Sequence, residues 1–315
     1  MSGGPSDGPP DALVRALLDG PSALSGFEWH DEVGSTNALA ADAARRGVPE
    51  IHAVAADVQT AGRGRRGRSW HALPGSSLMV SLVLRPQVSE ATFGTLPLLI
   101  GSVLAEVVSA HLWDGQRGPD VGLKWPNDLL VEGRKVAGIL IERFGSAAVA
   151  GIGCNVDWRG VERPADLAEA GSLAEFAGAG RDVDRWRLFA GLIGVLDHRY
   201  ADWQADPGPT LASYRTRCDT LGRWVRVERG GPHSTERGGR SVEPGGQEAT
   251  ERGDRSSERG DRSFERGGQE AIERDDHQPL EGRATAITDE GNLRLATPDG
   301  DVTVAAGDVV HLRPR

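Results

Sequence analysis

The sequence predicts an α+β fold with a mainly antiparallel or mixed sheet, followed by a smaller β domain. Three observations support this prediction: helical and strand-like segments do not alternate regularly, turn signals separate several short strands, and the last part alternates apolar and polar residues. The chain has 315 residues, of which 38% are hydrophobic and 26% are charged. Such a length can hold one large domain and a smaller one.

Apolar residues at helical spacing predict the helices, and buried or alternating apolar runs predict the strands. We expect helices at 11–18, 37–47, 93–112, 184–204 and 210–217. Ser35-Thr36 is a good N-cap pair for the second helix. We expect strands at 51–57, 77–84, 121–124, 128–131, 136–143 and 147–153, with Pro, Asn and Gly signals between the later ones.

A small β domain is predicted at the C-terminal end. Residues 221–228 form a strand-like run, and residues 281–314 alternate around turns at 289–291, 299–300 and 306–308. Four or five short strands suggest an SH3-like barrel. We therefore expect a large domain at 11–218 and a smaller one at 219–315.

The region 229–279 interrupts the smaller domain. It repeats ERG or ERD and holds nine arginines and twelve acids but only five apolar residues. Such a segment cannot bury enough surface to offset its ordering entropy, so we predict a disordered insert. The first ten residues, MSGGPSDGPP, are predicted to be a disordered tail.

Composition limits the classes of function. The net charge of −10 opposes a protein built to coat nucleic acid, so no DNA partner is expected. We find neither a membrane span nor a secretion signal, and the two cysteines show no metal-ligand or disulfide spacing. We expect a cytoplasmic protein.

Lysine is scarce in this chain. Only two of the 36 basic residues are lysines, Lys124 and Lys135, and they lie eleven positions apart. Codon bias toward arginine explains the scarcity but not the clustering. Because a compact ammonium and a planar guanidinium are not interchangeable, we infer that this stretch contains a position that requires lysine.

A segment from Gln59 to Trp70 combines four arginines with three glycines, in the order QTAGRGRRGRSW. The glycines fit the pattern G-x-G-x-x-G, but that pattern must open a helix, and here Pro74-Gly75 and a strand-like run follow. Arginine clamps phosphate and carboxylate, and glycine lets a ligand approach the backbone. We favour a clamp for a small anionic molecule; a solvated basic loop or a nucleic-acid patch is the alternative.

Two further motifs carry polar residues at strand ends. In Lys124-Trp-Pro-Asn-Asp128, the lysine is suited to neutralising charge on an attacked phosphate, and Asp128 is a candidate Mg²⁺ ligand or a turn cap. In the run from Gly151 to Asp157, Asn155 either orients a ligand or caps a turn. We expect Cys154 to be a buried small residue and not a nucleophile.

These motifs, in this order and at these separations, resemble the bacterial biotin protein ligases. The resemblance covers about 30–228 and resumes at 281–315, and the GRGRRG and KWPND elements together are specific. It implies a catalytic domain with the fold of class II aminoacyl-tRNA synthetases and an SH3-like C-terminal domain. Fewer than 30 residues precede the matched part, so we expect the type without an N-terminal DNA-binding domain.

The resemblance also implies roles for single residues. The biotin site would include Ser35, Thr36, Asn37, Gln59, Arg63, Gly64, Arg65 and Lys135, with Lys135 and Arg65 acting in catalysis. The ATP or adenylate site would include Arg66, Trp70, Lys124, Asn127 and Asn155, with Asp128 as a possible Mg²⁺ ligand. The arginine loop would shield a reactive mixed anhydride from water.

The activity that the resemblance implies has two steps. Biotin and Mg²⁺-bound ATP would give biotinyl-5′-adenylate, and a lysine of the biotin carboxyl carrier domain of an acyl-CoA carboxylase would accept the biotinyl group. The alternatives are a lipoate or other acyl ligase of the same superfamily and a non-catalytic nucleic-acid-binding module. An adaptor role for the charged insert is a third possibility.

Overall fold

The computed structural model describes residues 8–20, 24–70, 72–160, 167, 169–178, 180–228 and 279–312. The predicted tail at 1–10 lies outside this part except for 8–10, and the predicted insert at 229–279 lies outside it except for 279. No helix in the described ranges is long and apolar enough to cross a membrane.

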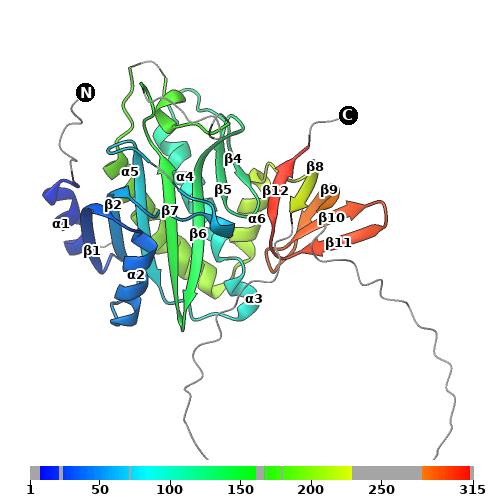
Figure 1. Cartoon of the computed structure of the whole chain (residues 1–315), viewed down its shortest axis with the longest axis horizontal. Coiled ribbons are helices and arrows are strands. Elements are labelled where there is room, and N and C mark those ends of the chain that lie inside the picture. The colour runs from blue at the N-terminus through cyan, green and yellow to red at the C-terminus, as the bar shows by residue number, and fades with distance from the viewer. Residues whose placement is uncertain are drawn as a thin grey trace, which may run out of the picture.

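The large domain is built on a seven-stranded mixed sheet with the strand order β1-β2-β3-β7-β6-β5-β4 (Figure 1). Only β1 and β2 are parallel neighbours; the other pairs are antiparallel, as predicted for a mixed sheet. The strands are β1 (Gly26–Val33), β2 (His52–Gln59), β3 (Ser77–Leu84), β4 (Val121–Lys124), β5 (Asp128–Val131), β6 (Arg134–Phe144) and β7 (Ala147–Asn155).

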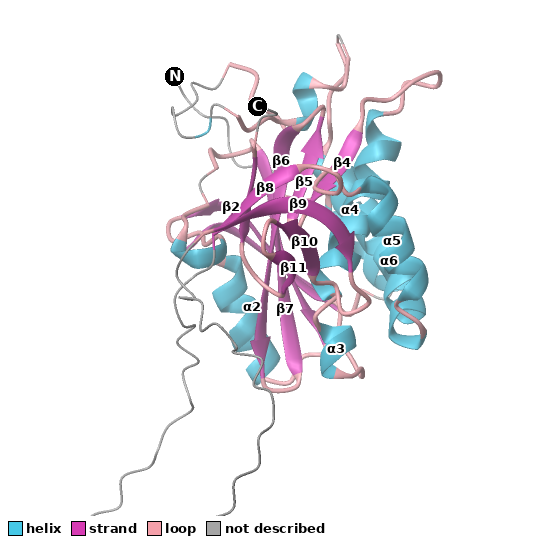
Figure 2. Cartoon of the chain, turned by 90° about the vertical axis from the view of Figure 1, so that its right-hand side faces the viewer, coloured by secondary structure: helices cyan, strands magenta, loops and turns pink. Residues whose placement is uncertain are grey.

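Helices cover both faces of this sheet. Figure 2 shows α4 (Leu96–Leu112), α5 (Arg185–Ala205) and α6 (Gly208–Arg217) on one side and α2 (Thr36–Arg45) on the other. The short helix α1 (Asp11–Asp19) contacts α5. Every residue of β3 is buried, because this strand lies in the middle of the sheet with helices on each face. Its mainly apolar run, in which only Ser77 and Ser81 are polar, is typical of a strand covered on both faces.

Two elements differ from the sequence predictions. The helix predicted at 93–112 is divided into α3 (Glu90–Phe93) and α4, because Gly94 and Thr95 form a turn between them. The buried Thr95 hydroxyl accepts a hydrogen bond from Trp203 Nε1 at 2.7 Å, which fixes this turn against α5. Strand β1 was not predicted; it carries three acidic residues and is only partly buried, so its apolar pattern is weak.

The smaller domain is a five-stranded antiparallel sheet with the order β11-β10-β9-β8-β12, which confirms the predicted SH3-like unit. Its strands are β8 (Trp224–Glu228), β9 (Leu280–Ile287), β10 (Leu293–Thr297), β11 (Gly300–Val304) and β12 (Asp308–His311). Gly291 and Gly300 adopt φ of 80° and 113° at two of the predicted turns, a backbone conformation that favours glycine.

Trp125 joins the two domains. Its side chain is fully buried, its backbone N–H donates to Thr220 Oγ1 at 3.0 Å, and its indole N–H donates to the carbonyl of Gly291 at 2.9 Å. The smaller domain therefore packs directly against the turn that carries the KWPND motif.

The buried ion pair between Arg185 and Asp57 supports the first stability prediction. Arg185 donates to Asp57 Oδ1, and the Asp57 side chain is 0% exposed. Replacing Arg185 by Met leaves a buried carboxylate without its cation, so we expect the free energy of unfolding to fall by about 3–5 kcal/mol in urea denaturation. In the control Arg199→Met, which breaks an exposed pair with Glu106, we expect a loss below about 1 kcal/mol. Equal losses in the two variants would contradict this reading.

Candidate active site

A pocket of 1060 Å³ opens between the large sheet, the arginine loop and the smaller domain. Every predicted site residue except Arg66 lines it: Ser35, Thr36, Asn37, Gln59, Arg63, Gly64, Arg65, Trp70, Lys124, Asn127, Asp128, Lys135 and Asn155. These residues come from chain segments up to 120 positions apart, so the fold gathers them in one place.

One end of the pocket is a buried polar cluster at the start of α2. Gln59 Oε1 accepts hydrogen bonds from the backbone N–H of Thr36 at 2.8 Å and from its hydroxyl at 3.1 Å. Asn37 Oδ1 accepts from Ser81 Oγ at 2.6 Å. A Cβ on Gly151 would lie 2.1 Å from Asn37 Oδ1, so only glycine fits beside this amide. Ser35 is the N-cap of α2, as predicted, although its side chain makes no capping hydrogen bond.

The arginine loop, residues 62–70, is closed by its own backbone. Gly64 N–H donates to the carbonyl of Arg68 at 2.7 Å, and Trp70 N–H donates to that of Gly62 at 2.9 Å. Arg66 and Gly67 adopt left-handed φ of 57° and 72° at the tip. The next regular element is the strand β3, so the loop is not the strand–helix turn of a dinucleotide-binding motif.

The turn between β11 and β12 holds the loop from the smaller domain. Arg68 pairs with Asp308 Oδ2 at 2.7 Å, and Arg66 lies 3.8 Å from the same oxygen. Arg65 donates to the carbonyl of Gly307 at 3.3 Å. Sequence reasoning placed a turn at 306–308 but missed its contact with the loop, because nothing in the local sequence signals a partner 242 positions away.

Further contacts hold the loop from the large sheet. Arg65 donates to Asn127 Oδ1 at 3.1 Å. Glu142, which was not predicted as a site residue, accepts from Arg63 and also from Asn37 Nδ2 at 2.7 Å. This carboxylate therefore links the loop to the polar cluster. Burial lowers the pKa of the Arg65 guanidinium from its ordinary value, while Asp308 and Asp128 oppose that shift.

The two lysines of the chain meet in another corner of the pocket. Lys135 Nζ pairs with Asp128 Oδ1 at 2.7 Å and lies 5.9 Å from the centre of the Trp70 ring. Lys124 faces Asp128 across the β4–β5 hairpin. Within the described part of the chain, no carboxylate lies within 4.0 Å of the Lys124 ammonium. Burial lowers the pKa of Lys124, and the neighbouring charge of Asp128 opposes that shift.

Trp70 packs on a floor of glycines. A Cβ on Gly153 would lie 2.4 Å from the indole, and one on Gly138 would lie 3.2 Å from it. The Trp70 N–H is buried and has no hydrogen-bond partner among the described residues. The Trp70 indole therefore occupies the space that a side chain at Gly153 would fill.

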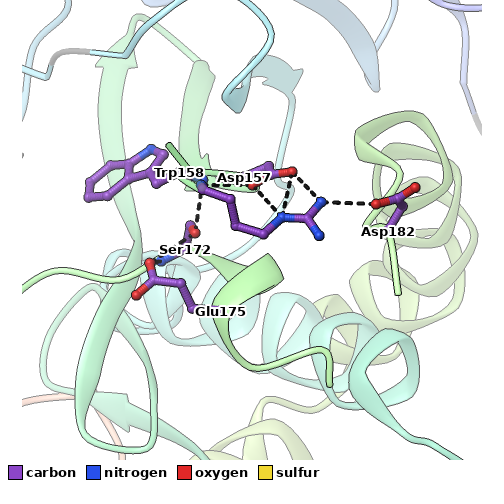
Figure 3. Close-up of polar contacts among 6 residues, drawn as sticks. Asp157, Trp158, Ser172, Glu175 and Asp182 are labelled. Atoms are coloured by element: carbon purple, nitrogen blue, oxygen red, sulfur yellow. Dashed lines mark hydrogen bonds and ion pairs between the residues drawn. The ribbon is translucent and has the colours of Figure 1, made fainter. Parts of the chain in front are cut away.

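Hydrogen bonds to backbone and side chains fix the part of the pocket that Asn127, Asn155 and Trp158 line. Asn127 Nδ2 donates to the carbonyl of Ile139 at 2.8 Å, and Asn155 Nδ2 donates to that of Gly171 at 3.0 Å. Figure 3 shows the segment after Asn155, where Trp158 N–H donates to Ser172 Oγ at 3.0 Å. Since Trp158 lines the pocket, this bond sets one of its edges.

Two titratable groups, one on β7 and one on β12, are held neutral by their surroundings. Burial raises the pKa of the Cys154 thiol to about 12, which agrees with the prediction that it is not a nucleophile. His311 was not predicted; burial, Lys124 and Arg223 lower its pKa to about 4. Its Nε2 lies 3.2 Å from the Thr220 hydroxyl, which also binds the backbone of Trp125.

Comparison with known proteins identifies the class of protein to which this chain belongs. Residues 34–158 match the biotin/lipoate A/B protein ligase family, and residues 268–312 match the biotin protein ligase C-terminal domain. The fold is similar to that of the biotin protein ligase from Aquifex aeolicus solved with biotin and ATP. The TM-score is 0.64 at 21% identity, covering 92% of this chain and all of that one. The fold and these matches place the chain among the biotin and lipoate protein ligases.

Closer relatives narrow the class to one family. The chain is 33% identical over 297 residues to the biotin–[acetyl-CoA-carboxylase] ligase of Mycobacterium tuberculosis (strain H37Rv), covering 92% of each protein. It is 38% identical over 176 residues to the bifunctional ligase/repressor BirA of Escherichia coli (strain K12), covering 54% of this chain and 51% of that protein. The chain belongs to the biotin protein ligase family, as its motifs predicted.

The contacts of Asp308 predict a change in loop mobility. Asp308→Asn removes the charge that holds Arg68 and Arg66, so we expect backbone amides of residues 62–70 to exchange with deuterium at least about fivefold faster. The matched control is Asp289→Asn, which alters an exposed carboxylate of the smaller domain that pairs with Arg215 of α6. Unchanged protection in the Asp308 variant would show that the smaller domain does not restrain the loop.

Proposed function

We propose that this chain activates biotin with ATP to biotinyl-5′-adenylate and transfers the biotinyl group to a lysine of a carrier protein. The observation that carries the proposal is the single pocket that contains a polar cluster, an arginine loop and two lysines. The names of the relatives support the same activity. We assign catalysis to the large domain, residues 11–218. We assign residues 219–315 to an SH3-like domain that contains an insert at 229–279.

The polar cluster is suited to the neutral ring of biotin. Ser35, Thr36 and Asn37 are buried and offer hydroxyl and amide groups. Gln59 lies beside them, and Arg63, Gly64, Arg65 and Lys135 complete the proposed biotin site. In this arrangement the biotin carboxylate points from the cluster toward the cations, because a buried carboxylate needs a positive partner.

The other half of the pocket is suited to the nucleotide. Trp70 offers a ring face and a buried N–H, and Asn127, Asn155 and Lys124 line the same pocket. We also assign Arg66 to the ATP side. It does not line the pocket, so we propose that it acts through the loop by its contact with Asp308.

The first chemical step is attack of a biotin carboxylate oxygen on the α-phosphorus of ATP, with pyrophosphate leaving. Lys135 and Arg65 would hold the two anionic reactants in contact and neutralise charge on the phosphoryl oxygens. In the second step, a carrier lysine attacks the adenylate carbonyl and AMP leaves. Until then, the arginine loop would keep water from the anhydride.

The residues present fit a Mg²⁺ ion that arrives with ATP. Among the described residues there is no group of three or more His, Cys, Asp or Glu side chains that would hold a metal by themselves. Mg²⁺ normally keeps several waters and binds one or two carboxylates plus substrate phosphates, and Asp128 supplies one such carboxylate. The ion would neutralise phosphate charge; Asp128 would then be shared between it and Lys135.

The proposed carrier is the biotin carboxyl carrier domain of an acyl-CoA carboxylase, following the name of the Mycobacterium tuberculosis relative. We propose a cytoplasmic location, where ATP is available. Both cysteines are free and buried, which is compatible with a reducing compartment.

The adenylating step predicts biotin-dependent exchange of labelled pyrophosphate into ATP without any carrier. Lys135→Ala should lower this exchange at least about 100-fold, because it removes a pocket cation from the developing charge. Arg199→Ala, on an exposed face, is the control and should retain full exchange. Exchange with lipoate but not with biotin would identify a lipoate ligase, and exchange with neither would refute adenylation by this chain.

Loosening the arginine loop predicts release of the adenylate. Arg65→Gly removes the contacts with Asn127 and Gly307, so we expect biotinyl groups on lysines of an added bystander protein to rise at least about tenfold. The control Arg226→Gly alters an exposed arginine of the smaller domain. If the variant retained its adenylate as well as the unaltered chain, the loop would not be the barrier.

A further inference from the structure

The distribution of lysine has a chemical consequence that rests on the proposed function. Biotinyl adenylate acylates free amines, and this sequence holds only two lysine ε-amines, both of which line the pocket. The other basic residues are arginines, whose guanidinium groups stay protonated and do not compete as nucleophiles. The amine of Met1 is therefore the one amine of the chain other than Lys124 and Lys135.

The two lysines differ in their surroundings. The ammonium of Lys135 is held by Asp128 at 2.7 Å, so attack on a carbonyl would require this ion pair to break. Lys124 lies opposite Asp128 across the hairpin, without a carboxylate within 4.0 Å among the described residues. Attack by Lys124 on a bound carbonyl therefore requires no protein ion pair to break, in contrast to attack by Lys135.

The position of Lys124 is also suited to the reaction. Lys124 and Lys135 share the Asp128 corner, where we place the phosphate of the adenylate. In a mixed anhydride the carbonyl carbon is joined to phosphorus through a single bridging oxygen. An amine beside the phosphate therefore lies close to the electrophilic carbon.

We propose that Lys124 is a self-acylation site, modified by the bound adenylate when no carrier is present. The Lys124 amine attacks the carbonyl carbon, a C–N amide bond forms, and the C–O bond to the phosphate breaks. AMP leaves with the electron pair, and the proton of the attacking amine passes to solvent. The product is a neutral biotinyl amide inside the pocket, so the modified chain loses one of its two ammonium groups and its capacity for further adenylation.

The test uses the full chain and synthetic biotinyl-5′-adenylate, without carrier or ATP. Adducts are located by intact mass and peptide mapping, with and without an excess of a lysine-rich scavenger protein. We expect one adduct on Lys124 that the scavenger does not reduce, and we expect none there in Lys124→Arg.

A surface lysine supplies the matched control. Arg199→Lys places an amine at a half-exposed position, where only free adenylate can reach it, so the scavenger should suppress its labelling. Labelling of only Met1 or Lys135, suppression of the Lys124 adduct by the scavenger, or no adduct on the unaltered chain would overturn the proposal. Because the adenylate is supplied, none of these results bears on adenylation, which pyrophosphate exchange tests separately.

Discussion

The site depends on how four like charges are held in one short loop. Arg63, Arg65, Arg66 and Arg68 repel one another, and the loop keeps a defined path because carboxylates and carbonyls from two domains meet them. Glu142 approaches from the large sheet, and Asp308 approaches from the smaller domain. The smaller domain is therefore part of the pocket and not an appendage. The smaller domain packs against the large one through Trp125, and this packing fixes the distance between Asp308 and the loop. A shift of the smaller domain would therefore move Asp308 relative to the loop.

Three glycines shape the pocket because they leave room where other residues would place a side chain. Gly151 leaves room for the Asn37 amide, and Gly138 and Gly153 leave room for the indole of Trp70. All three lie on neighbouring strands, where a side chain would otherwise project into the site. The floor is consequently rigid backbone, which positions a ligand more precisely than flexible side chains would.

The sequence predicted those parts of the structure that local patterns encode. The apolar run of β3, the helical spacing of α5 and the glycine-rich loop each carry their signal within a few residues. Strand β1 was missed because its acidic residues hide the pattern, and it is stabilised by parallel pairing with β2. Glu142 and Asp308 were missed for another reason: their arginine partners, Arg63 and Arg68, lie 79 and 240 positions away, and only the fold brings the charges together. Lys124 and Lys135 were predicted as site residues because the scarcity of lysine is visible in the sequence alone.

The two lysines of the pocket differ in whether a protein carboxylate neutralises their charge. Lys135 has a carboxylate partner, so an incoming phosphate must share it with Asp128. The Lys124 ammonium has no ion-pair partner among the described residues, and the buried indole N–H of Trp70 has no hydrogen-bond partner there, which is costly. An anionic ligand that satisfies both groups gains their interactions without breaking protein contacts. The same ammonium has no carboxylate partner among the described residues, whereas Lys135 is held by Asp128. A site that forms an acylating reagent therefore binds its substrate with a group that the reagent can modify.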